Sequence, residues 1–375
     1  MVDVALTELQ RVPTSGARAV EMFRVDGLEL VAIPQLARDV PGEPAGMNGG
    51  DSDTELLLLR LVDGRYVPFS SLPGPGGEDA EFFTIGERAF LAVASIRTGA
   101  GPYQYTTSSR IYEWVDGAFT EFQRVPSHAA KQWRYWTVDG RHFLGLAQGL
   151  ELPHIPGPNR RSMIYEWDGG GFAEFQAVPS RWAYNWHPFH VDGTFFVAHA
   201  DHLDPSMLYR WDGQEYVAHQ TLRERTGRAF ADFTRDGDHY LLVAGIEEPP
   251  VLMKWTGEQF ILEQKLEGPG AREVLVVEHD DRLFVIRVNF ITGTPAAPDP
   301  SLLSQVYEWR EGELAVVAEF PTSGGTDVAA VPPEVPAQGD LRFVVSNSLS
   351  ADVRFATDTV VYSLSTATST ATVVS

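Results

Sequence analysis

The apolar positions of this chain fall in short runs, each preceded by a tight-turn signal. Runs such as "FLAVAS", "FLGLAQ", "FFVAHA", "YLLVAG" and "LFVIRV" follow "VDG" or an equivalent. A loop of variable length then leads to "IYEW" or a similar phrase. A second turn follows, such as Asp63-Gly64, Asp116-Gly117 or Asp212-Gly213, and then a short aromatic stretch such as "AFTEFQ". Asp-Gly between apolar runs is a strong hairpin signal because both turn residues adopt positive φ. The pattern predicts units of two hairpins and lacks the periodicity of amphipathic helices.

This unit recurs along the whole chain. Its markers are Trp114, Trp167, Trp211, Trp255 and Trp309, with Leu61 and Leu364 in the same place at the two ends. Successive markers lie 53, 53, 44, 44, 54 and 55 residues apart. Seven units of this period predict an all-β fold: a seven-bladed β-propeller of four-stranded antiparallel blades. An open β-solenoid, the alternative, would need shorter and more uniform coils.

The two ends of the chain predict how the ring closes. Residues 4–10, "VALTELQ", match the strand that is fourth in each unit, and the last unit ends soon after its third strand, "TVVYSLS". We therefore expect the N-terminal strand to complete the last blade. A single propeller domain is expected over residues 1–366, with a low-complexity tail over 367–375. The repeats are placed at about 4–64, 65–117, 118–170, 171–213, 214–257, 258–312 and 313–366.

The repeated phrase also resembles a known family. The pattern "FxxFQxVPS…W…VDGxxFLAVA…SxIYxWDG" is similar to the epilepsy-associated repeat (EAR), also called the epitempin or EPTP repeat, and "FAEFQAVPS", "NWHPFHVDGTFFVAHA" and "SMLYRWDG" match it nearly in full. The resemblance covers essentially the whole chain. It implies a seven-bladed propeller that acts as a protein-interaction module, in most members outside the cell.

Charge and composition narrow the partners. The chain of 375 residues has a formal net charge of −22 and no cysteine. Such an acidic protein repels phosphate backbones, so we expect no nucleic-acid partner. The chain also has no run of 18 apolar residues, so we expect no membrane insertion. Disulfides and thiolate zinc sites are excluded. The start has no basic segment followed by an apolar one, which predicts a cytoplasmic protein as written, or an extracellular one if the chain is a processed form.

The variable loops predict the functional face. The Asp-Gly turns close hairpins on one face of the disc, so the long segments 34–55, 95–109, 148–162 and 289–304 emerge on the other. Variable loops carry function more often than tight turns. We expect a binding module that takes a protein, glycan or small-molecule ligand on this long-loop face and at the mouth of the central channel.

One column of the repeat predicts an oxygen-lined site. Aligning the units places one residue of each blade at one height: Ala19, Asp79, Gln132, Asn185, Ala229, Glu273 and Asp327. Three carboxylates and two amides at a channel mouth suit a hard cation such as Ca²⁺, with Asp79, Gln132, Asn185, Glu273 and Asp327 as ligands. The alternative is a solvated polar rim.

A polar and aromatic cluster in the third and fourth units predicts ligand contacts. Its members are Lys131, Arg134, Tyr135, Arg181, Tyr184 and His187. Trp133 and Trp186 beside them are expected to pack between blades. For Arg134 and His187, structural pairing with buried acids is the slightly favoured alternative to ligand contact. The alternative function is a small-molecule enzyme at the channel mouth, with Arg134, His187, Glu81 and Asp79 as acid–base groups.

Other motifs carry weaker signals. "HADHLD" offers His199 and His202 with Asp201 or Asp204 as metal ligands, but residues three apart on a strand point to opposite faces, so exposed loop histidines are the favoured interpretation. His187 and His190 of "HPFH" fail the same test. No G-x-S-x-G, phosphate loop or nucleotide fingerprint is present.

Overall fold

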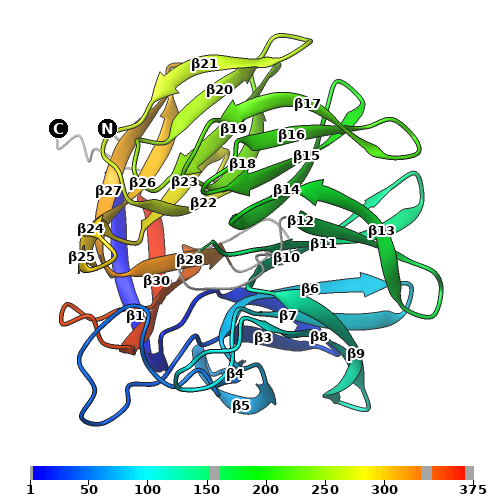
Figure 1. The fold of residues 1–375 in the computed structure, drawn as a ribbon. Coiled ribbons are helices and arrows are strands. Elements are labelled where there is room, and N and C mark those ends of the chain that lie inside the picture. The colour runs from blue at the N-terminus through cyan, green and yellow to red at the C-terminus, as the bar shows by residue number, and fades with distance from the viewer. Residues whose placement is uncertain (1–2, 152–160, 331–339, 368–375) are drawn as a thin grey trace, which may run out of the picture.

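The structure, a computed structural model, describes residues 3–151, 161–330 and 340–367. These residues form seven four-stranded antiparallel sheets arranged radially around a central channel (Figure 1), together with a small two-stranded hairpin. The described residues contain no helix, so none that is long and apolar enough to cross a membrane. The all-β seven-bladed propeller is confirmed. Residues 368–375 of the predicted tail lie outside the described residues.

Each blade runs outward from an innermost strand at the channel. Blade one contains β2 (Glu21–Val25), β3 (Leu28–Ile33), β4 (Glu55–Val62) and β5 (Arg65–Pro73). Blade two contains β6 (Gly77–Ile85), β7 (Arg88–Ser95), β8 (Thr106–Val115) and β9 (Ala118–His128). Blade three contains β10 (Ala130–Val138), β11 (Arg141–Gln148), β12 (Arg161–Trp167) and β13 (Phe172–Pro179). Blade four contains β14 (Ala183–Val191), β15 (Thr194–Asp201), β16 (Ser206–Trp211) and β17 (Tyr216–Arg223).

The remaining blades follow the same order. Blade five contains β18 (Gly227–Arg235), β19 (Asp238–Gly245), β20 (Val251–Trp255) and β21 (Phe260–Lys265). Blade six contains β22 (Ala271–His279), β23 (Arg282–Asn289), β26 (Ser301–Arg310) and β27 (Glu313–Ser323), and the hairpin of β24 (Thr292–Thr294) and β25 (Ala297–Asp299) extends one of its loops. Blade seven contains β28 (Gly325–Ala330), β29 (Leu341–Asn347), β30 (Ala356–Ala367) and β1 (Asp3–Ser15).

The N-terminal strand closes the ring, as the sequence predicts. β1 is the outermost strand of blade seven and pairs with β30 from Asp3↔Ala367 to Ser15↔Ala356. Figure 1 shows the blue and red strands side by side. Gln10 of β1 then joins blade seven to blade one. Its amide donates to the Tyr66 carbonyl at 2.7 Å and accepts from the Tyr66 N–H at 2.9 Å.

The repeated residues join neighbouring blades, which explains why the phrase recurs. In the inner hairpins the turn aspartate adopts positive φ, 47° at Asp26. Its carboxylate accepts the indole N–H of a marker tryptophan in the next blade, 2.6 Å from Trp114. The equivalent pairs are Asp139 with Trp211 and Asp192 with Trp255. A glutamine in four other outermost strands repeats the Gln10 contact: Gln123, Gln176, Gln220 and Gln264.

The outer turns differ from the prediction at Asp212-Gly213. Asp212 does not adopt positive φ there. Its Oδ1 accepts the N–H groups of Gln214 and Glu215, both at 2.8 Å, and so organises a longer loop. Aspartate side chains often bond the backbone two or three residues ahead, and this local bond replaces the two-residue turn.

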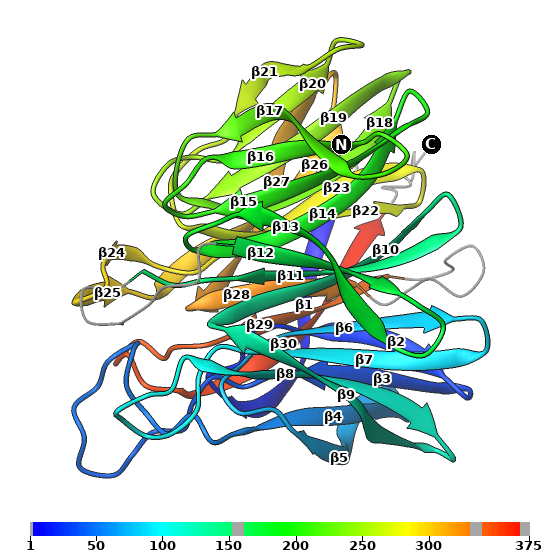
Figure 2. The same ribbon diagram turned by 45° about the vertical axis from the view of Figure 1, so that its right-hand side comes forward.

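The long loops project from one side of the disc. The β3–β4 loop and the β24–β25 hairpin extend from the same side in Figure 2. On that side an apolar cluster underlies the loops, with Leu36, Ile96, Leu150, Ile246 and Phe290 among its buried members. Between the blades, Trp133 and Trp186 are fully buried, which confirms their predicted packing role.

Candidate functional site

Two connected cavities follow the propeller axis. The channel between the seven inner strands has a volume of about 540 Å³. A second cavity of about 360 Å³, here called the bowl, lies on the long-loop face. The inner strands begin at this face, so their first residues separate the bowl from the channel.

The predicted oxygen column lines the channel. Asp79, Gln132, Asn185, Glu273 and Asp327 all border it. Three of them also hold the next blade in place: Asp79 accepts from the Trp133 N–H at 2.8 Å, Gln132 from the Trp186 N–H at 2.6 Å, and Asp327 from the Val20 N–H at 2.8 Å. The neutral side-chain amide of Gln132 thus accepts the same kind of hydrogen bond as the carboxylates of Asp79 and Asp327.

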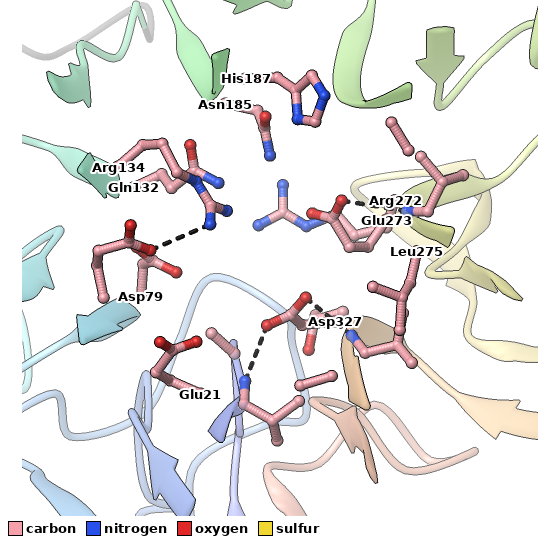
Figure 3. A pocket seen from close by; sticks show the side chains of 18 of the residues that line it. Glu21, Asp79, Gln132, Arg134, Asn185, His187, Arg272, Glu273, Leu275 and Asp327 are labelled. Carbon is pink, nitrogen blue, oxygen red and sulfur yellow. Dashed lines mark hydrogen bonds and ion pairs between the residues drawn. The ribbon is translucent and has the colours of Figure 1, made fainter. Parts of the chain in front are cut away.

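The channel is strongly acidic and contains a central arginine. Burial, with smaller contributions from neighbouring carboxylates, raises the pKa of Asp79 and Glu21 well above the ordinary values. Burial also raises the pKa of Glu273 to about 8, with a further contribution from Asp327, whose own pKa is raised by burial to about 6. Arg134 points toward the channel in Figure 3 and lies 3.1 Å from Glu81.

Arg134 is the counter-ion of this acidic channel. Burial disfavours its charge, but Glu81 and Asp79 together raise the pKa of its guanidinium. Glu81 also accepts from the Tyr135 N–H at 2.8 Å. The candidate acid–base groups therefore have protein partners, and His187 has one too, with its Nε2 2.7 Å from Asp232 Oδ1. The acid–base hypothesis for Asp79, Glu81, Arg134 and His187 stays a prediction.

The structure does not bring all six predicted ligand residues together. Lys131 and Tyr184 lie between the bowl and the channel, and Arg134, Tyr135 and His187 line the channel below them. Arg181 borders neither cavity. It lies in a connection between blades, where Nε and Nη2 contact Glu151 at 2.7 and 2.6 Å.

In the "HADHLD" motif, His199 and Asp201 make contacts within the protein. His199 is almost fully buried, contacts Ser162 at 3.0 Å and packs against Trp186, so it is not an exposed loop histidine. Asp201 accepts four backbone N–H groups, those of Arg181, Trp182, Leu203 and Asp204. His202 instead borders the bowl, and His190 is exposed.

No metal cluster of acidic and histidine ligands is formed by the part of the chain that the structure describes. Within it, no three His, Asp or Glu side chains are arranged to hold a metal ion. The three carboxylates of the predicted set, Asp79, Glu273 and Asp327, therefore do not form such a cluster, and its other two ligands are the amides Gln132 and Asn185. Calcium in the channel stays a prediction.

The sequence reasoning missed a second ring of residues as a ring and named only two of its members, Lys131 and Tyr184. One position before the predicted column, each blade contributes a residue to the partition between the cavities. We call it the mouth ring: Arg18, Glu78, Lys131, Tyr184, Arg228, Arg272 and Thr326. All seven border the channel, and all but Thr326 also border the bowl. An alignment shifted by one residue shows this run of cations.

A β-bulge explains why the regular alternation of side chains along a strand does not predict the mouth ring. The pairing of the inner strand with its neighbour skips one residue at this position in blades two, three, four, six and seven, for example between Ala130 and Gln132, and skips Arg228 and Ala229 in blade five. A bulge inserts an unpaired residue and re-aims side chains locally. Lys131 and Gln132 therefore both border the channel, although strict alternation would point them to opposite faces.

Known proteins have sequences similar to this chain. A model of the EPTP domain matches residues 65–115, 118–168, 171–212 and 215–256. The mouse protein named "Thrombospondin-type laminin G domain and EAR repeat-containing protein" is 28% identical over 168 residues, 43% of this chain and 24% of the relative. Its human counterpart is 27% identical over 181 residues, 47% of this chain and 25% of the relative. The chain thus spans about a quarter of the length of these curated relatives. The EPTP matches, together with the seven blades and their repeated contacts, show that this chain belongs to the EPTP, or EAR-repeat, family of β-propellers.

Proposed function

We propose that this propeller is a binding module that receives its ligand in the bowl on the long-loop face. The observation that carries the proposal is the composition of the bowl. Apolar side chains from several loops form its walls, among them Met47, Tyr105, Trp182, Phe290 and Ile291. Its floor is the mouth ring, where polar groups converge. An apolar pocket with a few convergent polar groups is the usual form of a ligand site.

The tight-turn face differs from the bowl. Its exposed apolar residues, such as Val62 and Val115, lie next to the Asp-Gly turns at the ends of β4 and β8. Single exposed apolar residues are normal on protein surfaces and mark no site by themselves. They therefore provide matched controls for substitutions in the bowl.

A neutral apolar dye tests the proposal. Nile red should bind the wild type and fluoresce, and Met47→Glu and Ile291→Glu, both at half-buried bowl positions, should weaken binding about tenfold or more, because each places a charge on an apolar wall. Val62→Glu and Val115→Glu should leave binding unchanged. Equal loss in both pairs, or no binding to the wild type, would overturn the assignment of the bowl.

A further inference from the structure

The mouth ring concentrates positive charge in a protein that is otherwise acidic. It contains four cations, Arg18, Lys131, Arg228 and Arg272, and one carboxylate, Glu78. Lys131 Nζ lies 3.1 Å from Glu78, and Arg18 and Arg272 each lie 3.6 Å from it. Three cations therefore share a single carboxylate, although the whole chain has a formal net charge of −22.

Arg228 lacks an acidic partner. In the described part of the chain, no carboxylate lies within ion-pair distance of its guanidinium, although the residue is 6% exposed. Nη1 donates to the Gly227 carbonyl at 2.8 Å and contacts His202 Nδ1 at 3.0 Å. The guanidinium also lies over the Tyr184 ring, 3.8 Å from its centre. Burying a charge without an opposite charge is costly, so this cation is poised for an anion.

The shifted pKa values of neighbouring groups reflect the same positive electrostatic field. Burial alone would raise the pKa of Tyr184, but Arg228, Lys131 and Arg272 lower it below its ordinary value. Burial, with repulsion from Arg228 next in size, lowers the pKa of His202 to about 4, so His202 adds no charge at neutral pH. Burial also lowers the pKa of Lys131, against the attraction of Glu78. Desolvated cations with excess positive charge around them gain from an anionic neighbour.

Two buried donors at the bowl make no hydrogen bond within the described chain, although Arg18 Nε lies 3.6 Å from Glu78. Among the described residues, neither Arg18 Nε nor Trp182 Nε1 makes a hydrogen bond, and both belong to residues that border the bowl. Arg18 is 8% exposed and its guanidinium lies 5.4 Å from the centre of the Phe290 ring. A buried donor left unpaired costs stability, and a ligand oxygen would remove that cost.

The walls and rim of the bowl determine the chemical character of the rest of the ligand. Leu36, Ile96, Leu150 and Ile246 are buried beside the mouth ring, so an apolar body would lie against them. Arg97 also borders the bowl, but its guanidinium already donates to Ser52, Asn48 and Gly49. The acidic group Glu247 borders the bowl too, at an exposed position. The charge contrast therefore runs from a cationic floor to an apolar and weakly acidic rim.

We propose that the bowl binds a small organic anion, a carboxylate or a phosphate monoester on an apolar body, with the anionic group seated on the mouth ring. This inference rests on the proposed function and specifies the ligand class. Arg228 and Lys131 contact the anion, since both charges border the bowl. Of the four cations, Arg228 is the least closely paired with Glu78 and Lys131 the most closely paired. Charge-assisted hydrogen bonds of this kind are stronger than neutral ones.

The test uses ligands that share one apolar body. Octanoate, octyl phosphate, octanol and octylammonium are titrated into the full chain by calorimetry. Octanoate or octyl phosphate should bind at least about tenfold more tightly than octanol, and octylammonium should be weakest. Preference for octanoate over octyl phosphate, or the reverse, identifies the head group. If neither octanoate nor octyl phosphate bound more tightly than octanol, the proposal would be overturned.

Variants of the mouth ring give effects of opposite sign. Arg228→Met should weaken octanoate binding about tenfold, whereas Arg228→Lys should keep most of it. Glu78→Gln should tighten octanoate binding, because it removes the carboxylate that lies within ion-pair distance of Arg18, Lys131 and Arg272. A purely structural ring would not change affinity in both directions. If Glu78→Gln fails to fold, octanoate should raise the melting temperature of Arg228→Met less than that of the wild type.

Nile red separates the two proposals. If Nile red binds in the bowl while neither anion binds better than octanol, the anion proposal fails and the binding module stands. If Nile red also fails to bind, or binds without regard to Met47→Glu, the bowl assignment itself fails. Arg124→Met, at an exposed arginine that pairs with Glu121, serves as the charge-removal control and should change neither result.

Discussion

The mouth ring and the carboxylates of the channel occupy adjacent positions on the same seven inner strands, but they bury charge in opposite ways. Asp79 and Asp327 each accept a backbone N–H from the next blade, and Arg134 provides a counter-ion. In the mouth ring of the described chain, Arg228 has no carboxylate within ion-pair distance, and Arg18 Nε makes no hydrogen bond although it lies 3.6 Å from Glu78. On the anion proposal, the charge of the channel is satisfied within the protein, whereas part of the charge of the mouth ring is left for a ligand.

The mouth ring and the predicted column of residues from Ala19 to Asp327, here called the acidic layer, each take one residue from every blade. The largest expected effect therefore comes from removing ring closure. Deleting residues 3–15 removes β1, exposes the edge of β30 and cuts the Gln10–Tyr66 contact. We expect the melting temperature to fall by at least about 10 °C and the protein to aggregate. Gln10→Leu should cost only about 1–3 kcal/mol, since it leaves the strand in place. A truncated protein that melts like the wild type and stays monomeric would contradict closure through β1.

The second effect comes from removing the cation of the channel. Arg134→Met leaves Glu81, Asp79 and their neighbours without this counter-ion. Breaking a buried pair costs about 3–5 kcal/mol, which we reduce to about 2–3 kcal/mol because 37% of the Arg134 side chain is exposed. The loss in unfolding free energy should be larger at pH 8 than at pH 5, because protonated carboxylates no longer repel one another. Denaturant melts at the two pH values measure this difference, and an equal loss at both would show that charge is not the cause.

The third effect separates hydrogen bonding from charge in the acidic layer. Asp79→Leu leaves the Trp133 N–H without its acceptor and should cost about 1–2 kcal/mol. Asp79→Asn keeps an oxygen acceptor, as Gln132 does for Trp186, and removes a buried charge. It should therefore be neutral or slightly stabilising in denaturant melts. Equal destabilisation by the two substitutions would mean that the hydrogen bond between the blades contributes little.

The repeat made one layer visible in the sequence and hid the other. Periodicity, turn residues and the end strands were sufficient for the seven blades and for closure by β1, because these depend on local patterns that recur. The alignment of the repeat units also placed Asp79 and Asp327 at one height in the channel. Alternation fails at Glu78 and Arg228, where a bulge adds a residue, and no residue type announces that bulge. The hydrogen bonds that Arg181 and Trp182 donate to Asp201 depend on tertiary contacts and were out of reach, and the sequence raised an acidic partner for His187 without identifying Asp232.

A fourth effect follows from the raised pKa values in the acidic layer. Glu273 faces Asp327, Arg272 and Arg134, and its pKa rises from an ordinary 4.5 to about 8 in the folded protein. The folded state then binds more protons than the unfolded state between these values, so this stabilisation is present below about pH 4.5 and is lost as the pH rises through 8. Glu273→Gln in chelator should flatten that decline by a few degrees of melting temperature. Glu313→Gln, at an exposed position, should follow the wild type, and a Glu273→Gln curve parallel to both would contradict the raised pKa.

The smallest expected effect concerns calcium in the acidic layer. The calcium hypothesis predicts that the ion stabilises the folded state by mass action, so the wild type should melt higher in calcium than in chelator. We expect a gain of only about 1–2 °C, because Arg134 already neutralises part of the layer and both oxygens of Asp327 accept backbone N–H groups. Asp327→Asn should reduce the gain, and in chelator it should be neutral or slightly stabilising, since it removes repulsion with Glu273. Identical wild-type melts would remove the case for calcium. A bound ion would also add positive charge beneath the mouth ring, so octanoate should then bind more tightly in calcium than in chelator, which would join the two layers into one site.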